Sequence, residues 1–146
     1  MALILALGAG YLKWQDGSAR LAQTAATQSV QAAKDSTIAI LSYQPDTVDR
    51  DLTAAADRLT GDFRDEYRQL ITSVVAPGAK QMHISAVATV PAASLASATA
   101  NHAVVLVFVN QTTTIGNDPP TNTTSSVRVT LEKIEDRWLI SQFEPV

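Results

Sequence analysis

The spacing of apolar residues changes at about residue 79, and this change limits the folds that the chain can adopt. Before it, apolar side chains recur every three or four positions, which is typical of the buried face of a helix. After it, they recur at alternate positions, as they do in strands. The expected helices are 17–45, 46–61 and 62 to about 76, and the expected strands are 79–90, 101–115, 122–134 and 137–146.

Short connecting segments predict that the strands form an antiparallel meander. The small residues of 91–100, the breaker-rich segment 116–123 and the Glu135-Asp136 turn separate consecutive strands. Residues 101–115 are apolar on both faces over much of their length, which predicts a central strand. Helices followed by a meander predict an α+β fold, in which N-terminal helices pack on a curved antiparallel four-stranded sheet.

Capping and breaking residues predict where the helices begin and end. Ser18 is a fair N-cap for the first helix, and Pro45 stops it. Gly61 ends the second helix, and the Pro77-Gly78 pair ends the third.

The first residues predict an association with a membrane. Residues 2–12, ALILALGAGYL, are apolar, but a spanning helix needs about 20 apolar residues, so the stretch is too short alone. Tyr11, Lys13 and Trp14 are the residue types found at the headgroup level. We expect residues 1–16 to be the outer half of a membrane anchor whose beginning is missing, followed by an extracytoplasmic domain, 17–146. The alternative is a buried N-terminal core helix.

The segment LTGDFRDEYRQLI (59–71) crowds acidic and aromatic residues together, as a catalytic or metal site does. A helix start explains the same pattern. Asp62, Asp65 and Glu66 fall in the first turn, where carboxylates interact with the positive end of the helix dipole, and Asp62 or Thr60 can cap free N–H groups. The apolar stripe expected to face the sheet is Phe63, Tyr67, Leu70, Ile71 and Val74. We interpret the segment as a helix start, with Phe63 and Tyr67 mostly buried.

Other sequence features predict no metal site, no cofactor site and no nucleic-acid binding. The chain has no Cys, and its two histidines are His83 and His102. In a hairpin centred near Leu95, His83 faces a residue near Val109 and lies about 20 Å from His102, at ~3.3 Å per residue. The net charge is −3 with scattered Lys and Arg, which is unlike a nucleic-acid-binding surface. No nucleophile elbow, metalloprotease motif or phosphate-binding loop is present, and we assign no catalytic, metal or cofactor residue.

Three segments resemble the Mce-associated membrane protein family, actinobacterial envelope proteins associated with mammalian-cell-entry lipid importers. They are SYQPDTVDRDL (42–52), LTGDFRDEY (59–67) and RWLISQFEPV (137–146), and the resemblance covers roughly residues 10–146. It implies one N-terminal transmembrane helix, hence a single-pass protein of the cell membrane. It also implies an extracytoplasmic cone of the cystatin-like or nuclear-transport-factor-2-like kind, similar to the periplasmic domain of a type IV secretion subunit.

Two functions are consistent with these observations. The first is a non-enzymatic, membrane-anchored accessory or assembly subunit of a mammalian-cell-entry lipid import system. It would contact transporter subunits or related envelope proteins through the exposed edge of the meander and the polar region 111–126. The second is a small hydrophobic ligand-binding protein or isomerase-like enzyme, for which Tyr43 and Tyr67 with Asp57 are conceivable site residues. Because Asp57 is expected to face outward, we favour the non-enzymatic function.

Overall fold

The computed structural model describes the backbone of residues 2–146 and the side chains of residues 20–146. Its four strands pair antiparallel in the order β1-β2-β3-β4. The helices are α1 Ala2–Leu41, α2 Val48–Ala56, α3 Gly61–Leu70, the π-helix η1 Ile71–Val75 and α4 Ala76–Met82. The strands are β1 Ile84–Ala98, β2 His102–Ile115, β3 Thr121–Ile134 and β4 Arg137–Pro145. The predicted α+β class, with helices packed on an antiparallel meander, is confirmed.

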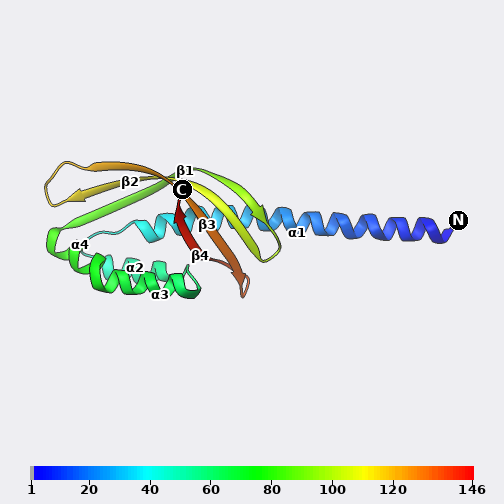
Figure 1. Cartoon of the computed structure of the whole chain (residues 1–146), viewed down its shortest axis with the longest axis horizontal. Helices are drawn as coiled ribbons and strands as arrows, with labels where there is room; N and C mark the ends of the chain where they lie inside the picture. Colours follow the sequence, from blue (N-terminus) through cyan, green and yellow to red (C-terminus); the bar gives the residue numbers. More distant parts are fainter. Residues whose placement is uncertain (1) are drawn as a thin grey trace.

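Helix α1 lies along one face of the sheet, and its N-terminal part extends away from the rest of the molecule (Figure 1). The prediction that Ser18 caps the first helix is wrong, because α1 continues through this position. The helix ends at Leu41, before Pro45. Leu21, which we placed on the buried stripe, is 66% exposed. No helix in the described part of the chain has the length and apolar character needed to cross a membrane. The side chains of Tyr11, Lys13 and Trp14 lie outside the described residues.

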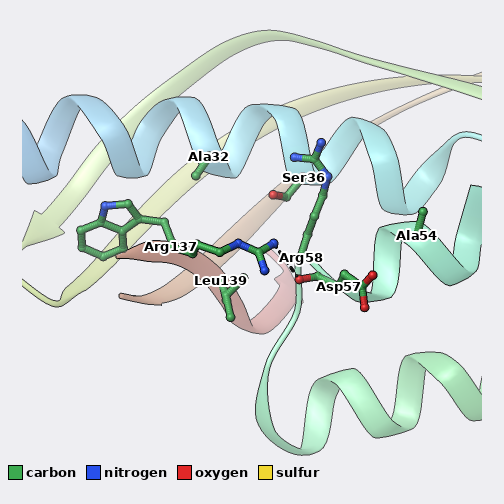
Figure 2. Close-up of a pocket in the computed structure, with 8 residues that line it drawn as sticks. Ala32, Ser36, Ala54, Asp57, Arg58, Arg137 and Leu139 are labelled. Atoms are coloured by element: carbon green, nitrogen blue, oxygen red, sulfur yellow. Dashed lines mark hydrogen bonds between the residues drawn. The ribbon is translucent and has the colours of Figure 1, made fainter. Parts of the chain in front are cut away.

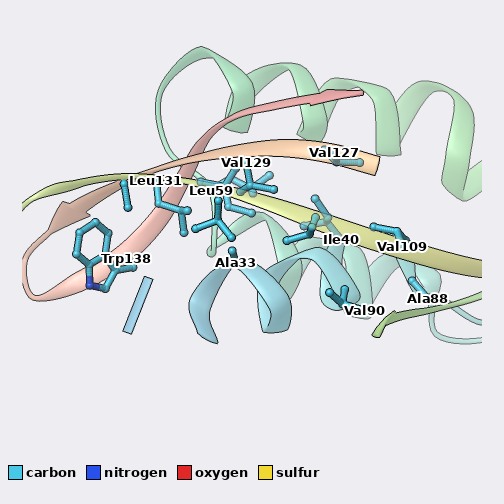
Figure 3. Packing of buried hydrophobic residues seen from close by; sticks show 14 of the residues in the cluster. Ala33, Ile40, Leu59, Ala88, Val90, Val109, Val127, Val129, Leu131 and Trp138 are labelled. Atoms are coloured by element: carbon cyan, nitrogen blue, oxygen red, sulfur yellow. The ribbon is translucent and has the colours of Figure 1, made fainter. Parts of the chain in front are cut away.

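The core lies between α1 and the inner face of the sheet. Buried valines of the two central strands, such as Val105, Val107 and Val129, face small residues of α1, such as Ala33. Figure 3 shows Ala33 and Leu59 packed against this face. Small side chains on α1 allow its backbone to approach the sheet closely, which improves dispersion contacts in the core. A second, smaller cluster joins α2 to η1 and α4 through Val48, Leu52, Ile71, Ala76 and Ala79.

The third helical segment does not end at Pro77-Gly78, contrary to the prediction. Proline lacks an N–H and its ring clashes with the carbonyl four residues earlier in a regular helix. Here a π-helical turn, Ile71–Val75, precedes it, and the Ala76 N–H bonds to the Ile71 carbonyl. Pro77 then sits in the first turn of α4, where its missing N–H costs little. The chain leaves the helix at His83, whose φ is 53°.

This extension of the helix corrects two further predictions. Residues 79–82, which we expected to begin a strand, are helical, and Met82 is 54% exposed. The predicted apolar stripe of this helix is also only partly correct. Ile71 is buried as expected, but Leu70 is 51% exposed and Val74 is 60% exposed.

Strand β1 is longer than predicted, because residues 91–98 continue it instead of forming a turn. Two register shifts, between Thr89 and Ala92 and between Leu95 and Ser97, interrupt its pairing with β2. Such bulges bend a strand and increase its twist. The hairpin turn lies beyond Ala98, so the predicted pairing of His83 with Val109 is wrong. Instead, the His83 carbonyl accepts a hydrogen bond from Gly116 N–H at 3.0 Å.

Candidate functional site: two openings that share Phe63 and Phe143

The acidic residues of the LTGDFRDEY segment lie near the start of α3, but only Asp62 is in its first turn, where all three were predicted. Asp62, Asp65 and Glu66 are exposed and lie in the first six residues of α3. Thr60 occupies the N-cap position, but no side chain caps the helix by a hydrogen bond, so the predicted capping role of Asp62 or Thr60 is wrong. Within the residues that the structure describes, no group of three or more acidic or histidine side chains is placed to hold a metal ion.

Phe63 is partly buried and holds the start of α3 against strand β4. Its ring stacks on that of Phe143, with centroids 6.1 Å apart and planes at 4°. The expectation that Phe63 and Tyr67 are mostly buried is therefore only partly correct, since both are of intermediate exposure and α3 has no fully buried residue. The stacked pair places the LTGDFRDEY segment next to the RWLISQFEPV segment, although 69 residues separate them in the chain.

One opening beside the stacked pair is acidic. It has a volume of about 440 Å³ and is formed by the start of α3 and the end of β4. We call it the acidic groove, and its lining residues are Gly61, Asp62, Phe63, Glu66, Ser141, Gln142, Phe143 and Glu144. Three of these carry carboxylates, and Glu144 also lies 3.7 Å from Arg128 on β3. A basic partner would therefore find both charge and aromatic surface in this groove.

The two edge strands of the meander differ in how much of their backbone is free to pair. The α2–α3 connection covers the middle of β4, where Ile140 bonds through its N–H to the Arg58 carbonyl and through its carbonyl to the Thr60 N–H, both at 2.9 Å. Residues 141–145 continue beyond this cover, next to the acidic groove. On the opposite edge, Tyr43 pairs with Ala86, and Pro91 and two bulges interrupt the remainder of β1. Proline and bulges discourage strand addition, and both edges carry them. On β4 a register shift falls at Ser141 and the strand ends at Pro145, so the uncovered, regular part of this edge is residues 142–144.

The second opening beside the stacked pair is apolar. It has a volume of about 260 Å³ and lies between the end of α1, α2, the α3–η1 helix and the sheet. We call it the apolar cleft, and its lining residues are Ile40, Leu41, Tyr43, Leu52, Phe63, Tyr67, Leu70, Ile71, Val75, Gln111 and Phe143. No charged side chain is among them. The cleft can therefore hold an apolar molecule or side chain, but it offers no carboxylate or imidazole for acid–base chemistry.

Two polar side chains of the apolar cleft are anchored to the end of α1. The Tyr67 hydroxyl donates to the Ile40 carbonyl at 2.9 Å, and the Gln111 amide donates to the Leu41 carbonyl at 3.2 Å. These bonds satisfy carbonyls that a helix end leaves without an intrahelical partner. Burial raises the pKa of both Tyr67 and Tyr43, because the charged phenolate is disfavoured away from water.

The residues considered for an isomerase-like site are not brought together. Tyr43 and Tyr67 line the apolar cleft, but Asp57 lines a separate cleft of about 370 Å³ with Arg58 and Arg137. Figure 2 shows this arrangement, in which the Arg137 guanidinium donates to the Asp57 backbone carbonyl at 3.1 Å. The Asp57 carboxylate is 64% exposed and lies 3.7 Å from Arg68, so it faces outward as predicted.

Most of the remaining predicted features lie apart from both openings, although Gln111, the first residue of the polar region 111–126, lines the apolar cleft. His83 is exposed at the end of α4, whereas His102 begins β2 and its Nδ1 lies 2.8 Å from Glu132 Oε1. The polar region 111–126 forms the ends of β2 and β3 and the turn between them, and most of it is exposed. Cross-strand side-chain bonds, such as Thr112 to Asn122 at 2.8 Å, order part of it.

Comparison with known proteins places the chain in a family. The family described as "Uncharacterized protein Rv1363c/MT1408-like" matches residues 1–146. The chain belongs to this family. A relative named outer membrane protein Rv1973, from Mycobacterium tuberculosis (strain ATCC 25618 / H37Rv), is 61% identical over 146 residues. That match covers 100% of this chain and 91% of the relative.

Solved structures with the same fold include secretion-system domains. The periplasmic domain of DotI has a TM-score of 0.65 at 17% identity, covering 80% of this chain and 91% of that chain. VirB8 of Agrobacterium tumefaciens has a TM-score of 0.64 at 14% identity, covering 80% and 88%. At these identities the likeness concerns the fold alone. It confirms the predicted nuclear-transport-factor-2-like cone, with its open sheet and packed helices.

Proposed function

We propose that this chain is a membrane-anchored accessory or assembly subunit of the cell envelope that acts through protein–protein contacts and has no enzymatic activity of its own. Its partners are subunits of a mammalian-cell-entry lipid import system or related envelope proteins. The observation that carries the proposal is the acidic groove, which joins two of the three segments that resemble Mce-associated proteins. The groove lies beside the end of β4 and is lined by three carboxylates and two aromatic rings.

The N-terminal part of α1 supports a location next to a membrane. In this proposal residues 1–16 belong to a single-pass membrane anchor and residues 17–146 form the extracytoplasmic domain. The 61% identical relative carries the name outer membrane protein, which is consistent with an envelope location. Helix α1 is continuous from Ala2 to Leu41, and about 35 Å of it precedes Ala25, the first buried residue among those whose side chains the structure describes. In this proposal the continuous helix would connect the anchor to the domain.

The acidic groove favours one mode of contact. The uncovered backbone of residues 142–144 can accept a short added strand from a partner, as in other cases of β-augmentation. Asp62, Glu66 and Glu144 then pair with Lys or Arg side chains of that strand. Exposed charge pairs of this kind contribute mainly to partner selection and association rate, while backbone hydrogen bonds and the aromatic pair contribute affinity.

Site-specific photo-crosslinking in intact cells tests this proposal. A photoreactive residue replaces Gln142, which is exposed and lines the acidic groove, and mass spectrometry identifies the captured proteins. The matched control carries the same residue at Gln69, which is exposed on α3 but does not line the groove. We expect transporter subunits or other envelope proteins from position 142 and not from position 69. Capture of no envelope protein at position 142 would contradict the proposal.

An isomerase-like enzyme is the second candidate, and the apolar cleft with its two tyrosines is the observation that favours it. This candidate requires an acid or base in the cleft, but Asp57 lies elsewhere. Turnover of a small hydrophobic substrate by the purified protein, combined with a negative crosslinking result, would decide in favour of the enzyme.

A further inference from the structure

The apolar cleft is formed by several segments that are far apart in the chain, and it opens to solvent. Its walls come from the end of α1, from α2, from α3 with η1, and from β2 and β4. Its volume of about 260 Å³ is slightly below the range of drug-sized ligand sites, which starts at roughly 300 Å³, so only a small molecule fits. Leu70 lines this cleft and is 51% exposed, so it lies at the opening.

The π-helical turn is part of the cleft wall. Ile71 and Val75, the first and last residues of η1, both line the cleft. Turns of this type are rare, and they occur frequently at functional sites. In this chain the turn lets the helix continue past Pro77, and it also keeps Val75 on the cleft while Val74 points to solvent.

The polar groups of the cleft restrict the chemistry of an occupant. No charged residue lines it, so a charged ligand would lose its hydration without gaining a counter-charge. The Tyr67 hydroxyl already donates a hydrogen bond to the Ile40 carbonyl, and its oxygen can still accept one. The Gln111 amide nitrogen is engaged by Leu41, which leaves its amide oxygen as an acceptor. In the described part of the chain the Tyr43 hydroxyl makes no hydrogen bond to protein.

We propose that the apolar cleft binds a small, neutral, apolar molecule that carries a hydroxyl group. The apolar body replaces water against the aliphatic and aromatic walls. The hydroxyl donates to the Gln111 amide oxygen or to the Tyr67 oxygen and accepts from the Tyr43 hydroxyl. This ligand site is independent of the partner contact proposed for the acidic groove, although the two openings share Phe63 and Phe143.

Calorimetric titration of the full chain with 1-octanol and with octanoate tests the ligand class. The two probes have the same chain length and differ in charge and head group. We expect saturable binding of 1-octanol with a negative heat-capacity change, because apolar surface becomes buried. Octanoate should bind at least about tenfold more weakly, because the cleft has no cation for its carboxylate. Equal binding of both probes, or no saturable binding of 1-octanol, would overturn the proposal.

Two pairs of variants locate the site. Leu70→Trp fills the mouth of the cleft and should weaken 1-octanol binding at least about tenfold, a steric effect of overpacking. Val74→Trp places the same ring on an exposed neighbouring position outside the cleft and should leave binding unchanged. Tyr43→Phe removes one hydroxyl and should weaken binding roughly three- to tenfold, the range of one hydrogen bond. Circular-dichroism melting verifies that each variant is folded.

Each outcome of the variant series is informative. Equal loss of binding in Leu70→Trp and Val74→Trp would place the probe outside the cleft. If Leu70→Trp fails to fold, Tyr43→Phe still tests the hydroxyl contact, and unchanged affinity in that variant would refute it. Crosslinking at position 142 is measured separately, so failure of the ligand proposal leaves the partner proposal intact.

Discussion

Replacing Phe63 by Ala measures how strongly α3 is held on the sheet. A fully buried Phe→Ala change costs about 3–5 kcal/mol of the free energy of unfolding. Phe63 is only partly buried, and it borders both the acidic groove and the apolar cleft, so part of its ring has no protein neighbours to lose. We therefore expect a cost of about 2 kcal/mol, a value between the surface and core cases. Of this, about 0.5–1.5 kcal/mol belongs to the stacked ring of Phe143.

A double-mutant cycle isolates the ring–ring contribution. Urea unfolding followed by circular dichroism is measured for the wild type, Phe63→Ala, Phe143→Ala and the double variant. We expect a coupling energy of about 1 kcal/mol, the range found for aromatic pairs in contact. Leu52→Ala is the control for a fully buried residue and should cost about 2–5 kcal/mol, since Leu52 is 1% exposed. A cost above about 4 kcal/mol for Phe63→Ala, or additive effects of the two aromatic changes, would refute this reasoning.

Other predictions concern single features of the domain. Asp65→Asn should change the free energy of unfolding by less than ~1 kcal/mol in a urea titration, because an exposed contact with the helix dipole is weak. Removal of residues 1–15 should leave a cooperative circular-dichroism melt, because the described core begins at Ala25. Thr37→Val should raise the free energy of unfolding by about 1 kcal/mol, and with it the melting temperature, because the buried Thr37 hydroxyl has no hydrogen-bond partner. Burial raises the pKa of Tyr67, so the unfolded chain releases this proton first as the pH rises above 10.0, and the free energy of unfolding should fall there. In Tyr67→Phe this alkaline loss should be smaller.

The sheet could be predicted from the sequence because each strand has one buried face. Val127, Val129 and Leu131 alternate with more exposed residues on β3, and each of the three is 3% exposed or less. The central position of β2 followed from its long apolar run, and it too is confirmed. In contrast, β1 was too short in the prediction because residues 91–98 are small and include Pro91. Their pairing depends on β2 and on bulges, which local sequence does not indicate.

In the helices, tertiary packing overrides some of the local sequence signals for where a helix ends. Pro77-Gly78 is a typical stop signal, yet packing of Ala76 and Ala79 against Val48 and Leu52 favours continuation through a π-helical turn. The acidic residues of α3 were correctly interpreted as a helix start from their position alone. The apolar cleft could not be found in the same way, because its walls come from segments far apart in the chain. The useful signal was the pair of tyrosines: Tyr43 follows the end of α1, and the Tyr67 hydroxyl bonds to a carbonyl at that same end.

The central claim is that the chain acts through its acidic groove. It is tested most directly by comparing how much partner protein co-purifies from native membranes with charge-reversal variants and with the wild type. The full chain is tagged, crosslinked in cells and purified, and the captured envelope proteins are quantified by mass spectrometry. Glu66→Lys reverses a charge within the groove, and Asp46→Lys reverses an exposed charge outside it. We predict that Glu66→Lys strongly reduces the recovery of mammalian-cell-entry transporter subunits, while Asp46→Lys matches the wild type. Equal recovery by both variants, or no transporter subunit with the wild type, would contradict the account.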